Sequence, residues 1–464
     1  MNKTLLALGL SLAFAGAAHA TTITPVNMDP AGSGLNDTTV AAPVGGNPGT
    51  SIGEQRRIAY QFAADLWEAI LVSSVETKVE ASFQALTCTA TSAVLGSAGT
   101  KTVHANFTNG VADTWYGNAL ANARAGADVS PTGNEIASRF NSNLGQANCL
   151  SGSGWYYGLD GNTPAGQISF LDVVMHEIGH GLNFQGFYSL TSGAPFGTAP
   201  NVFPDIYSRN VRDNGTGMAW TDLTNAQRVT AAIGGGLVWT GATVTAEAPA
   251  VLGPQVNLFL LLSGRPLDFP MVTAGYGPVA TTANFTTGQI VRAKDPSGGT
   301  SLGCAAFPAG AYTGKTVLMD RGSCSFKLKT MNAQNAGAAK VIIANNAASG
   351  YPGMGDDTAV PGTATIPSIG ITQAAGNMIK KNLIFGVQGN LQVKAGQFAG
   401  TDTSGRVYLY APNPVAGGSS FSHFDVSLSP NALMEPFIND SLNAAVELDL
   451  TPALFQDMGW TLAP

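Results

Sequence analysis

The chain has 464 residues and a formal net charge of −7, and only 11% of its residues are charged. This length allows two or three domains, each with a core of its own. The acidic balance argues against nucleic acid as a partner, because phosphate binding needs clustered Lys and Arg, and the 44% content of hydrophobic residues argues against a disordered chain.

Residues 1–20, MNKTLLALGLSLAFAGAAHA, have the pattern of an export signal peptide. Lys3 gives a basic start, an apolar run follows from Leu5, and small residues precede an expected cleavage after Ala20. No later segment reaches the roughly 18 apolar residues that span a bilayer. We therefore expect a protein without a membrane span that is secreted, periplasmic or held at the cell surface.

Residues 21–50 are rich in Gly, Pro and Thr and predict an extended N-terminal segment. A helix is predicted from its N-cap Ser51, because apolar residues then recur at four-residue intervals, at Ile58, Phe62, Leu66 and Ile70. A half-buried strand follows, in which apolar and polar residues alternate, with Val79, Ala81, Phe83 and Ala85 on one face. A helix followed by a strand indicates an α/β or α+β domain.

The segment SFLDVVMHEIGHGLNF, which starts at Ser169, predicts a buried helix. Ser169 can cap this helix, with Asp172 three residues on, and the positions that follow are mostly apolar. Beyond it the chain mixes loops with one short predicted helix around residues 225–232. Three aromatic residues lie just before the helix that starts at Ser169: Trp155, Tyr156 and Tyr157. They are expected in the core rather than in a substrate cleft.

The pattern of predicted strands and helices changes between residues 255 and 394. GKTVLMDRGSCSFKLKTMNAQNAGAAKVIIANN and TATIPSIGIT predict a strand, an amphipathic helix, a strand and a further strand that begins after a proline. This order predicts a small α/β module. Residues 395–464 resemble in pattern the sequence before residue 255. The segment LDLTPALFQDMGW predicts a final helix that packs Leu454, Phe455 and Met458.

The four cysteines form two local pairs, Cys88 with Cys149 and Cys304 with Cys324. In an oxidising compartment these pairs predict two disulfides, each inside its own domain. A zinc site built from cysteine would need the close C-x-x-C spacing, which is missing. No cysteine precedes Cys88, which argues against a thiol-based latency switch.

The segment HEIGH predicts a zinc site. His176 and His180 are four residues apart and project from one face of a helix, where they can bind one metal ion. Glu177 lies next to that face, where a carboxylate can polarise a metal-bound water. The five-residue pattern also occurs by chance, but a buried His, Glu and His in an apolar helix is costly without a metal or other partners.

A catalytic zinc takes three protein ligands and keeps one position open, so a third ligand is needed. The metzincin pattern continues HExxH with x-x-G-x-x-H. In this sequence Asn183 occupies the position of the glycine, and Gly186 occupies the position of the third histidine. Asn tolerates the left-handed backbone of such a bend, but glycine cannot bind zinc. His423 and His104 are the remaining histidines of the mature chain, and His104 is expected to be an ordinary strand residue. Two carboxylates are minor alternatives as ligands: Asp425 and Glu435.

HEIGHGLNF, followed far downstream by FSHF and then by NALMEP, resembles the leishmanolysin branch of the metzincin zinc peptidases. In that family an insertion separates the zinc helix from the third histidine, and a methionine turn lies under the metal. The resemblance implies one catalytic Zn²⁺ bound by His176, His180 and His423, with Glu177 as the catalytic base and Met434 in the turn. Ca²⁺ is a weaker expectation. Two polar pairs could bind it, Asp356 with Asp357 and Asp160 with Asn162, but neither has the ligand density of a calcium loop.

The insertion resembles the protease-associated (PA) domain, most clearly over residues 315–372. In this resemblance Cys304 and Cys324 correspond to a local disulfide, and the module has a role in substrate access or recognition without catalysis. The alternative is a solubilising insertion that binds no ligand.

We therefore expect an α+β fold with a metzincin-like catalytic domain, made of a mixed sheet and the HExxH helix, in two parts at residues 51–254 and 395–464. A small α/β PA domain at 255–394 interrupts it. The expected function is a secreted zinc endopeptidase that acts on proteins or peptides, in which Glu177 takes a proton from a zinc-activated water and passes it to the leaving amine.

The alternative is a secreted peptide- or glycan-binding protein with a structural or vestigial zinc site. A structural site closes all four metal positions with protein ligands, and the sequence offers three. An exopeptidase ranks lower, because no cluster of groups that would bind a chain terminus is evident. Cleavage specificity and oligomeric state stay open.

Overall fold

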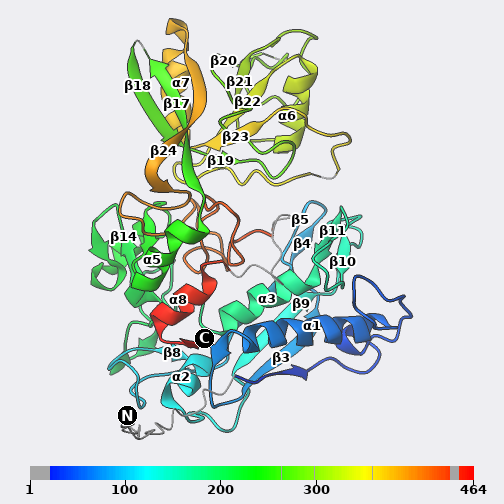
Figure 1. Cartoon of the computed structure of the whole chain (residues 1–464), viewed down its shortest axis with the longest axis vertical. Helices are drawn as coiled ribbons and strands as arrows, with labels where there is room; N and C mark the ends of the chain where they lie inside the picture. The colour runs from blue at the N-terminus through cyan, green and yellow to red at the C-terminus, as the bar shows by residue number, and fades with distance from the viewer. Residues whose placement is uncertain (1–20, 263, 297, 358, 439–448) are drawn as a thin grey trace, which may run out of the picture.

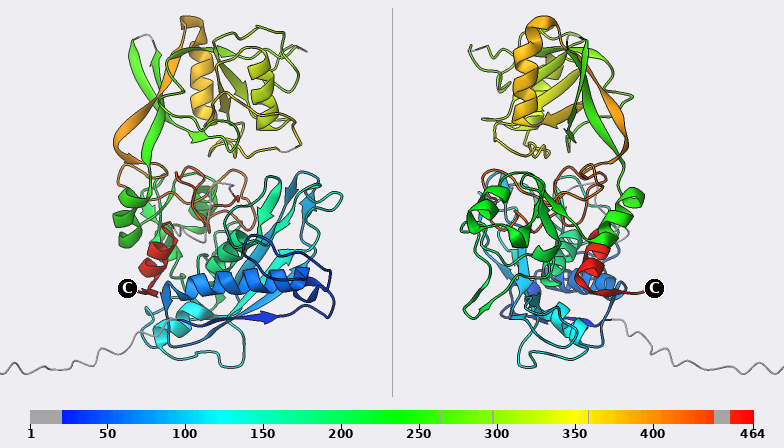
Figure 2. Two further views of the ribbon diagram at one scale, coloured as in Figure 1. Left: turned by 45° about the vertical axis from the view of Figure 1, so that its right-hand side comes forward. Right: turned by 90° about the vertical axis from the view of Figure 1, so that its left-hand side faces the viewer.

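The computed structural model describes residues 21–262, 264–296, 298–357, 359–438 and 449–464. The predicted signal peptide lies outside these residues. Two units are stacked along the long axis of the molecule (Figure 1; Figure 2). We call the described residues 21–253, 399–438 and 449–464 the HExxH domain, and the chain between them, which resembles the PA domain in sequence, is called the PA domain. The architecture is therefore mixed α+β with a separate inserted module.

A four-stranded mixed sheet forms the base of the HExxH domain, in the order β1-β3-β9-β6. The strands β1, β3 and β9 are parallel, and β6 is antiparallel to β9 at the edge. Two long helices, α1 and α3, pack on one face of the sheet, and the Trp67 indole of α1 donates a hydrogen bond to the Met175 carbonyl of α3 (3.1 Å). These elements are β1 Ile23–Asn27, α1 Ile52–Glu68, β3 Thr77–Gln84, β6 Gly96–Thr100, β9 Ile136–Asn141 and α3 Phe170–Gly181.

The predicted helix is α1, and its predicted N-cap is confirmed, since the Ser51 hydroxyl accepts the Glu54 N–H at 3.2 Å. The four apolar residues spaced by four are only half-buried, and the fully buried face is made of Ala59, Tyr60, Ala63, Ala64 and Trp67. Each step of four residues turns about 40° too far around the axis, so over the three steps from Ile58 to Ile70 the stripe drifts off the contact. Small alanines then let α1 approach its neighbours closely. The strand prediction is correct up to Phe83, but Ala85 lies beyond the end of β3 and is exposed.

The chain after the PA domain returns to the core of the HExxH domain. A single hydrophobic core contains side chains from both segments, among them Trp239 and Phe455. The Trp239 indole donates to Asp457 at 3.0 Å. The predicted last helix is α8, Thr451–Met458, and it buries Leu454, Phe455 and Met458 as predicted. The HExxH domain is thus one structural unit built from two separate segments.

Short elements complete the HExxH domain. They are β2 Leu71–Val72, β4 Cys88–Thr89, β5 Ser92–Ala93, β7 Val103–His104, β8 Tyr116–Gly117, α2 Asn118–Ala125, β10 Gly154–Tyr156, β11 Gln167–Ser169, β12 Gly197–Thr198, β13 Asn201–Val202, β14 Val211–Asp213, β15 Met218–Ala219, α4 Asn225–Ala231, β16 Leu237–Trp239, α5 Ala242–Val251 and β25 Thr461–Leu462.

An eight-stranded sheet forms the PA domain, in the order β18-β17-β24-β20-β21-β22-β23-β19. The predicted strand, helix, strand and strand are β21, α6, β22 and β23, and the three strands are parallel to one another. Helices α6 and α7 contribute to separate cores on the two faces of the sheet. The elements are β17 Pro254–Leu262, β18 Arg265–Pro270, β19 Val272–Thr273, β20 Gly288–Arg292, β21 Thr316–Asp320, α6 Phe326–Asn335, β22 Lys340–Ala344, β23 Ser368–Ile371, α7 Gln373–Asn382 and β24 Gln388–Phe398.

Both predicted disulfides are present, Cys88–Cys149 in the HExxH domain and Cys304–Cys324 in the PA domain. Among the helices that the structure describes, none is long and apolar enough to cross a membrane.

Candidate metal centre

Helix α3 presents the two histidines of the motif from a rigid, buried position. The Ser169 hydroxyl caps the helix by accepting the backbone N–H of Asp172 at 3.2 Å. The apolar residues of α3 are buried, so the helix cannot turn without exposing them. His176 and His180 lie one turn apart on the remaining face, and both reach a cleft in the surface.

The structure brings His423 to these two residues across 243 positions of sequence. The Nε2 atoms of His176 and His180 are 3.1 Å apart, and each lies 3.1 or 3.2 Å from Nε2 of His423. The three nitrogens form a nearly equilateral triangle. Zinc bound to nitrogen at about 2.0–2.1 Å in a tetrahedral arrangement places neighbouring nitrogens about 3.3 Å apart, so the triangle has the size that a zinc ion requires.

Backbone carbonyls fix the orientation of all three imidazoles. Nδ1 of His176 donates to the Leu433 carbonyl (2.7 Å), Nδ1 of His180 to the Phe184 carbonyl (2.8 Å). Nδ1 of His423 donates to the Ser419 carbonyl (2.7 Å). With the proton on Nδ1, each Nε2 carries a lone pair, and three lone pairs face one another without a donor between them. That arrangement is repulsive unless a cation occupies the centre.

Burial also keeps these histidines neutral. It lowers the pKa of His176 to about 4 and that of His180 to about 3, and it holds the pKa of His423 well below the usual range. The cause is the loss of hydration of the charged form. Neutral imidazole is the form that binds metal ions, and the donor set therefore fits zinc.

The segment that carries His423 packs against the position where the motif lacks a ligand. The backbone N–H of Gly186 donates to the Ser422 hydroxyl at 3.2 Å, and a Cβ on Gly186 would lie 2.4 Å from the Phe421 ring. A side chain at residue 186 would therefore push the His423 segment away. Asn183, at the preceding position of the pattern, has a positive φ of 93°, which agrees with the predicted bend.

Met434 lies directly beneath α3. Its side chain is fully buried, and its sulfur is 2.8 Å from where a Cβ on Gly179 would stand. Gly179 precedes His180, so Met434 packs under the helix turn that carries the histidines. The backbone carbonyl of Met434 accepts the N–H of Phe424, the residue after His423 (2.9 Å). Met434 thus packs against helix α3 and is tied to the segment of His423.

Glu177 is buried beside the triangle without full hydrogen bonding. Its Oε2 atom has no hydrogen-bond partner among the described residues. Burial raises the pKa of Glu177 to about 8, against the lowering effects of the Ala98 N–H and the Arg139 charge. A Cβ on Gly96 of β6 would lie 2.6 Å from Oε1 of Glu177, so only a glycine lets the edge strand approach the carboxylate this closely.

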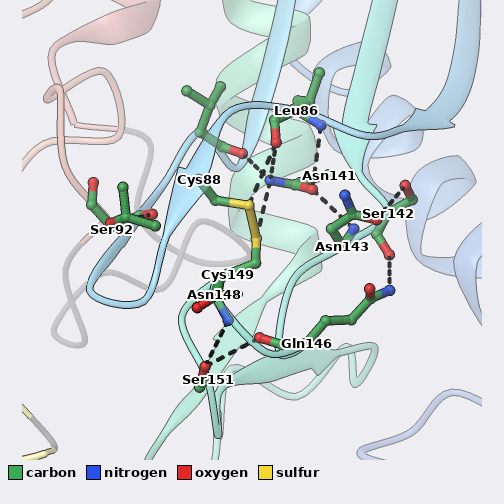
Figure 3. Close-up of a disulfide and its surroundings, with 12 residues drawn as sticks. Leu86, Cys88, Ser92, Asn141, Ser142, Asn143, Gln146, Asn148, Cys149 and Ser151 are labelled. Atoms are coloured by element: carbon green, nitrogen blue, oxygen red, sulfur yellow. Dashed lines mark hydrogen bonds between the residues drawn. A yellow bond between two sulfur atoms is a disulfide. The ribbon is translucent and has the colours of Figure 1, made fainter.

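A cleft of about 930 Å³ contains the three histidines and Glu177. Its walls come from the segment between residues 86 and 98, which includes the edge strand β6, and from the chain on both sides of His423 and Met434. The disulfide Cys88–Cys149 braces one wall, and beside it the Asn141 amide donates to the carbonyls of Leu86 and Val94 (Figure 3). This wall is therefore cross-linked to the sheet beneath it.

The other candidate ligands lie outside the triangle. Of the described His, Cys, Asp and Glu residues, only the three histidines gather closely enough to hold a metal ion. His104 is a half-buried strand residue whose Nε2 contacts the Thr102 hydroxyl at 3.0 Å. Asp425 accepts the N–H of Ser427, and Glu435 lies in the cleft wall and accepts the N–H of Ala432.

The aromatic and acidic groups noted in the sequence have structural roles. Trp155 and Tyr157 pack edge-on against Phe170 at the start of α3, and they do not line the cleft. Asp160 accepts the hydroxyl of Tyr156. The candidate calcium ligand Asp356 pairs with Lys327 at 3.1 Å.

Several residues that shape the site give no signal in the sequence. The carbonyls that hold the imidazoles belong to ordinary residues, and Gly96 and Gly186 act through the side chain that they lack. Arg139 lines the cleft from the central strand β9. These contributions depend on backbone position and on strand pairing, so residue type alone could not have identified them.

Comparison with known proteins identifies the insertion. A family model of the PA domain matches residues 286–379, so the chain contains a PA domain. A PII-type proteinase of Lacticaseibacillus paracasei is 34% identical over 141 residues, which are 30% of this chain and 7% of the relative. A PI-type proteinase of Lactococcus lactis subsp. cremoris is 33% identical over 110 residues, 23% of this chain and 6% of the relative. The chain thus matches only a small fraction of the length of these relatives.

Solved structures align with about a third of the chain. A zinc aminopeptidase from Bacillus subtilis is 20% identical and covers 34% of this chain and 38% of its own, with a TM-score of 0.22. A subtilisin-like protease from Pseudoalteromonas sp. AS-11 is 20% identical and covers 36% of this chain and 37% of its own, with a TM-score of 0.24. Scores this low carry no argument about the HExxH domain, whose chemistry rests on the geometry above.

Proposed function

We propose that this protein is an exported zinc-dependent endopeptidase of the metzincin type. In this proposal the catalytic domain is split between residues 51–254 and 395–464 and is interrupted by the PA domain at 255–394. The observation that carries the proposal is the triangle of three neutral Nε2 atoms, separated by 3.1–3.2 Å, next to a buried and incompletely bonded glutamate. The PA domain and the partial likeness to proteinases support a peptidase.

His176, His180 and His423 would hold the zinc ion, and Met434 would support the helix turn beneath it. A zinc ion in this position supplies Lewis-acid polarisation of a carbonyl and activation of water. Its positive charge would also favour the ionised form of Glu177, whose pKa burial otherwise raises to about 8. The three imidazoles already point at one place, so little reorganisation is needed on binding.

Glu177 is the proton carrier of the proposed reaction. Its Oε2 atom is free of partners in the described structure and can take a proton from the attacking water. The same carboxyl can return that proton to the leaving amine. Strand β6 and Met434 both pack close to α3, so the carboxyl stays in one position relative to the histidines.

The edge strand β6 favours cleavage within a chain rather than at its end. β6 closes one side of the described four-stranded sheet and lines the cleft beside Glu177. An extended peptide can add to such an edge through main-chain hydrogen bonds. A substrate held along its backbone can extend past both ends of the cleft, as an endopeptidase requires.

The PA domain contacts the HExxH domain at Ile233, outside the cleft, and at Phe437, in the cleft wall. The Ser349 hydroxyl donates to the Ile233 carbonyl at 2.5 Å. A Cβ on Gly353 would lie 3.5 Å from the ring of Phe437, and Phe437 lines the cleft. These contacts support a role of the PA domain in substrate access.

The test is the zinc content of the purified mature protein and of two histidine variants. We expect about one zinc per parent chain, a loss of at least tenfold in zinc affinity in His423→Ala, and no change in His104→Ala, which alters a histidine outside the site. Hydrolysis of a mixed peptide library should follow the zinc content. Parental zinc affinity in His423→Ala would contradict the ligand assignment, and zinc binding without hydrolysis of any peptide would contradict the endopeptidase.

A further inference from the structure

The end of the PA domain farthest from the HExxH domain exposes bulky apolar side chains. After α7 the chain forms a short 3-10 turn, Leu383–Phe385, in which Ile384 is 83% exposed and Phe385 is 66% exposed. Gly386 ends the turn in the left-handed conformation and sends the chain into β24. All three ribbon views place this turn at the tip of the molecule, opposite the HExxH domain (Figure 1; Figure 2).

Strand pairing brings a further apolar residue to the same tip. Gln388, just after the turn, is paired with Leu261 of β17, and Leu261 is 52% exposed. We call Leu261, Ile384 and Phe385 the apolar tip. Adjacent bulky apolar residues as exposed as Ile384 and Phe385, with a third close by through strand pairing, mark a candidate interaction site.

The charge around the apolar tip is opposite in sign to the charge of the whole chain. The chain at this end of the PA domain, residues 259–267 and 378–390, contains no Asp or Glu and carries Arg265, Lys380 and Lys381. Lys380 pairs with Asp320. Arg265 and Lys381 are exposed and form no ion pair with another described residue. An excess positive charge therefore surrounds the tip of a protein whose net charge is −7.

We propose that the apolar tip docks on the surface of an anionic lipid bilayer. A projecting turn that carries two adjacent bulky apolar residues can enter the region between headgroups and acyl chains, while flanking cations meet anionic headgroups. The turn lies at the end of the molecule in all three ribbon views, and the three apolar residues offer far less surface than a stable protein interface needs. The HExxH domain lies at the other end, so the docked protein would hold its cleft away from the membrane. This inference does not depend on the proposed peptidase activity.

The experiment is co-sedimentation of the purified mature chain with lipid vesicles. One set contains phosphatidylcholine alone, and the other contains phosphatidylcholine with about 30% phosphatidylglycerol. We expect binding to the anionic vesicles that is about tenfold or more stronger than to the neutral ones and that weakens as salt is raised. The double variant Ile384→Ser, Phe385→Ser should lower this binding about tenfold, and Lys381→Glu should lower it to a similar extent.

Val40→Ser is the matched control, because Val40 is 87% exposed on the N-terminal segment of the HExxH domain. It should bind vesicles like the parent. Circular dichroism and the thermal midpoint of each variant show whether it is folded. Absence of binding by the parent, or equal binding by the parent and the folded tip variants, would overturn the proposal. Self-association of the parent that the tip variants abolish, without vesicle binding, would assign the tip to an interface between copies and would also overturn it.

Discussion

Glu177 in the HExxH domain and Lys329 in the PA domain are both buried ionisable residues, but their surroundings differ. Lys329 is fully buried, and its ammonium group donates to the carbonyls of Leu302 and Gly322 at 2.5 and 2.7 Å. It also contacts Cys304 of the local disulfide at 3.6 Å. Oε2 of Glu177 is buried and has no hydrogen-bond partner among the described residues, and Glu177 lines the cleft.

The difference separates a structural role from a functional one. A buried charge whose hydrogen bonds are satisfied can hold loops in place. Lys329 does this by bonding the carbonyls of Leu302 and Gly322, which lie near the two cysteines of the disulfide. A buried ionisable group that lacks a partner is costly to keep, and such groups cluster where chemistry takes place. The three histidines beside Glu177 follow the same pattern, since their Nε2 lone pairs face one another. The predictions below test this distinction.

The largest expected effect is on catalysis. Glu177→Gln keeps the size of the side chain but removes the proton acceptor, so we expect hydrolysis to fall about 10²–10⁴-fold. Zinc content should not change, because Glu177 is not one of the three proposed ligands. The measurement is kcat/KM on a cleaved peptide together with metal analysis. Activity within a factor of two of the parent would show that another group carries the proton.

A smaller effect, on stability alone, is expected for Lys329→Met. The change leaves the carbonyls of Leu302 and Gly322 without their donor, and we expect the free energy of unfolding to fall by about 1–3 kcal/mol. Peptide hydrolysis at a temperature where the variant is folded should equal that of the parent. Lys381→Met is the matched control, because Lys381 is exposed and its loss should change stability by no more than about 0.5 kcal/mol. A catalytic defect in the folded Lys329 variant would contradict the structural role.

The smallest effect is a difference in pH dependence between the parent and Lys329→Met. Burial lowers the pKa of Lys329 from 10.5 to about 8, although Asp295 and Asp320 oppose the shift. Between pH 8 and 10.5 the unfolded chain holds the extra proton, so this residue makes the unfolding free energy rise with pH in that window and not below it. We expect the stability gap between parent and variant to widen from pH 8 to 10. Urea titrations at several pH values measure the gap, and a constant gap would contradict the shifted pKa.

Much of the molecule follows from local sequence patterns. The helix at Ser169 with its cap, the spacing of His176 and His180, the strand and helix order of the PA domain and the last helix agree with the structure. These features depend on residues a few positions apart, where helix and strand geometry fix which side chains are neighbours. The two disulfides agree as well, because each lies within one domain.

Other features were decided by tertiary structure. Sequence spacing predicted the helix α1 but did not show which of its residues are fully buried, since that depends on which neighbour the helix packs against. The sequence showed that a third ligand had to come from outside the motif, and the resemblance suggested His423, but spacing could not place it 3.1 Å from His176. The carbonyls that orient the imidazoles and the glycine that lets β6 reach Glu177 also lie far away along the chain. By itself the sequence determined the local elements and the chemical types available to the site. The geometry of the site required the common core of two segments separated by a whole domain, because only that packing fixes distances between residues remote in sequence.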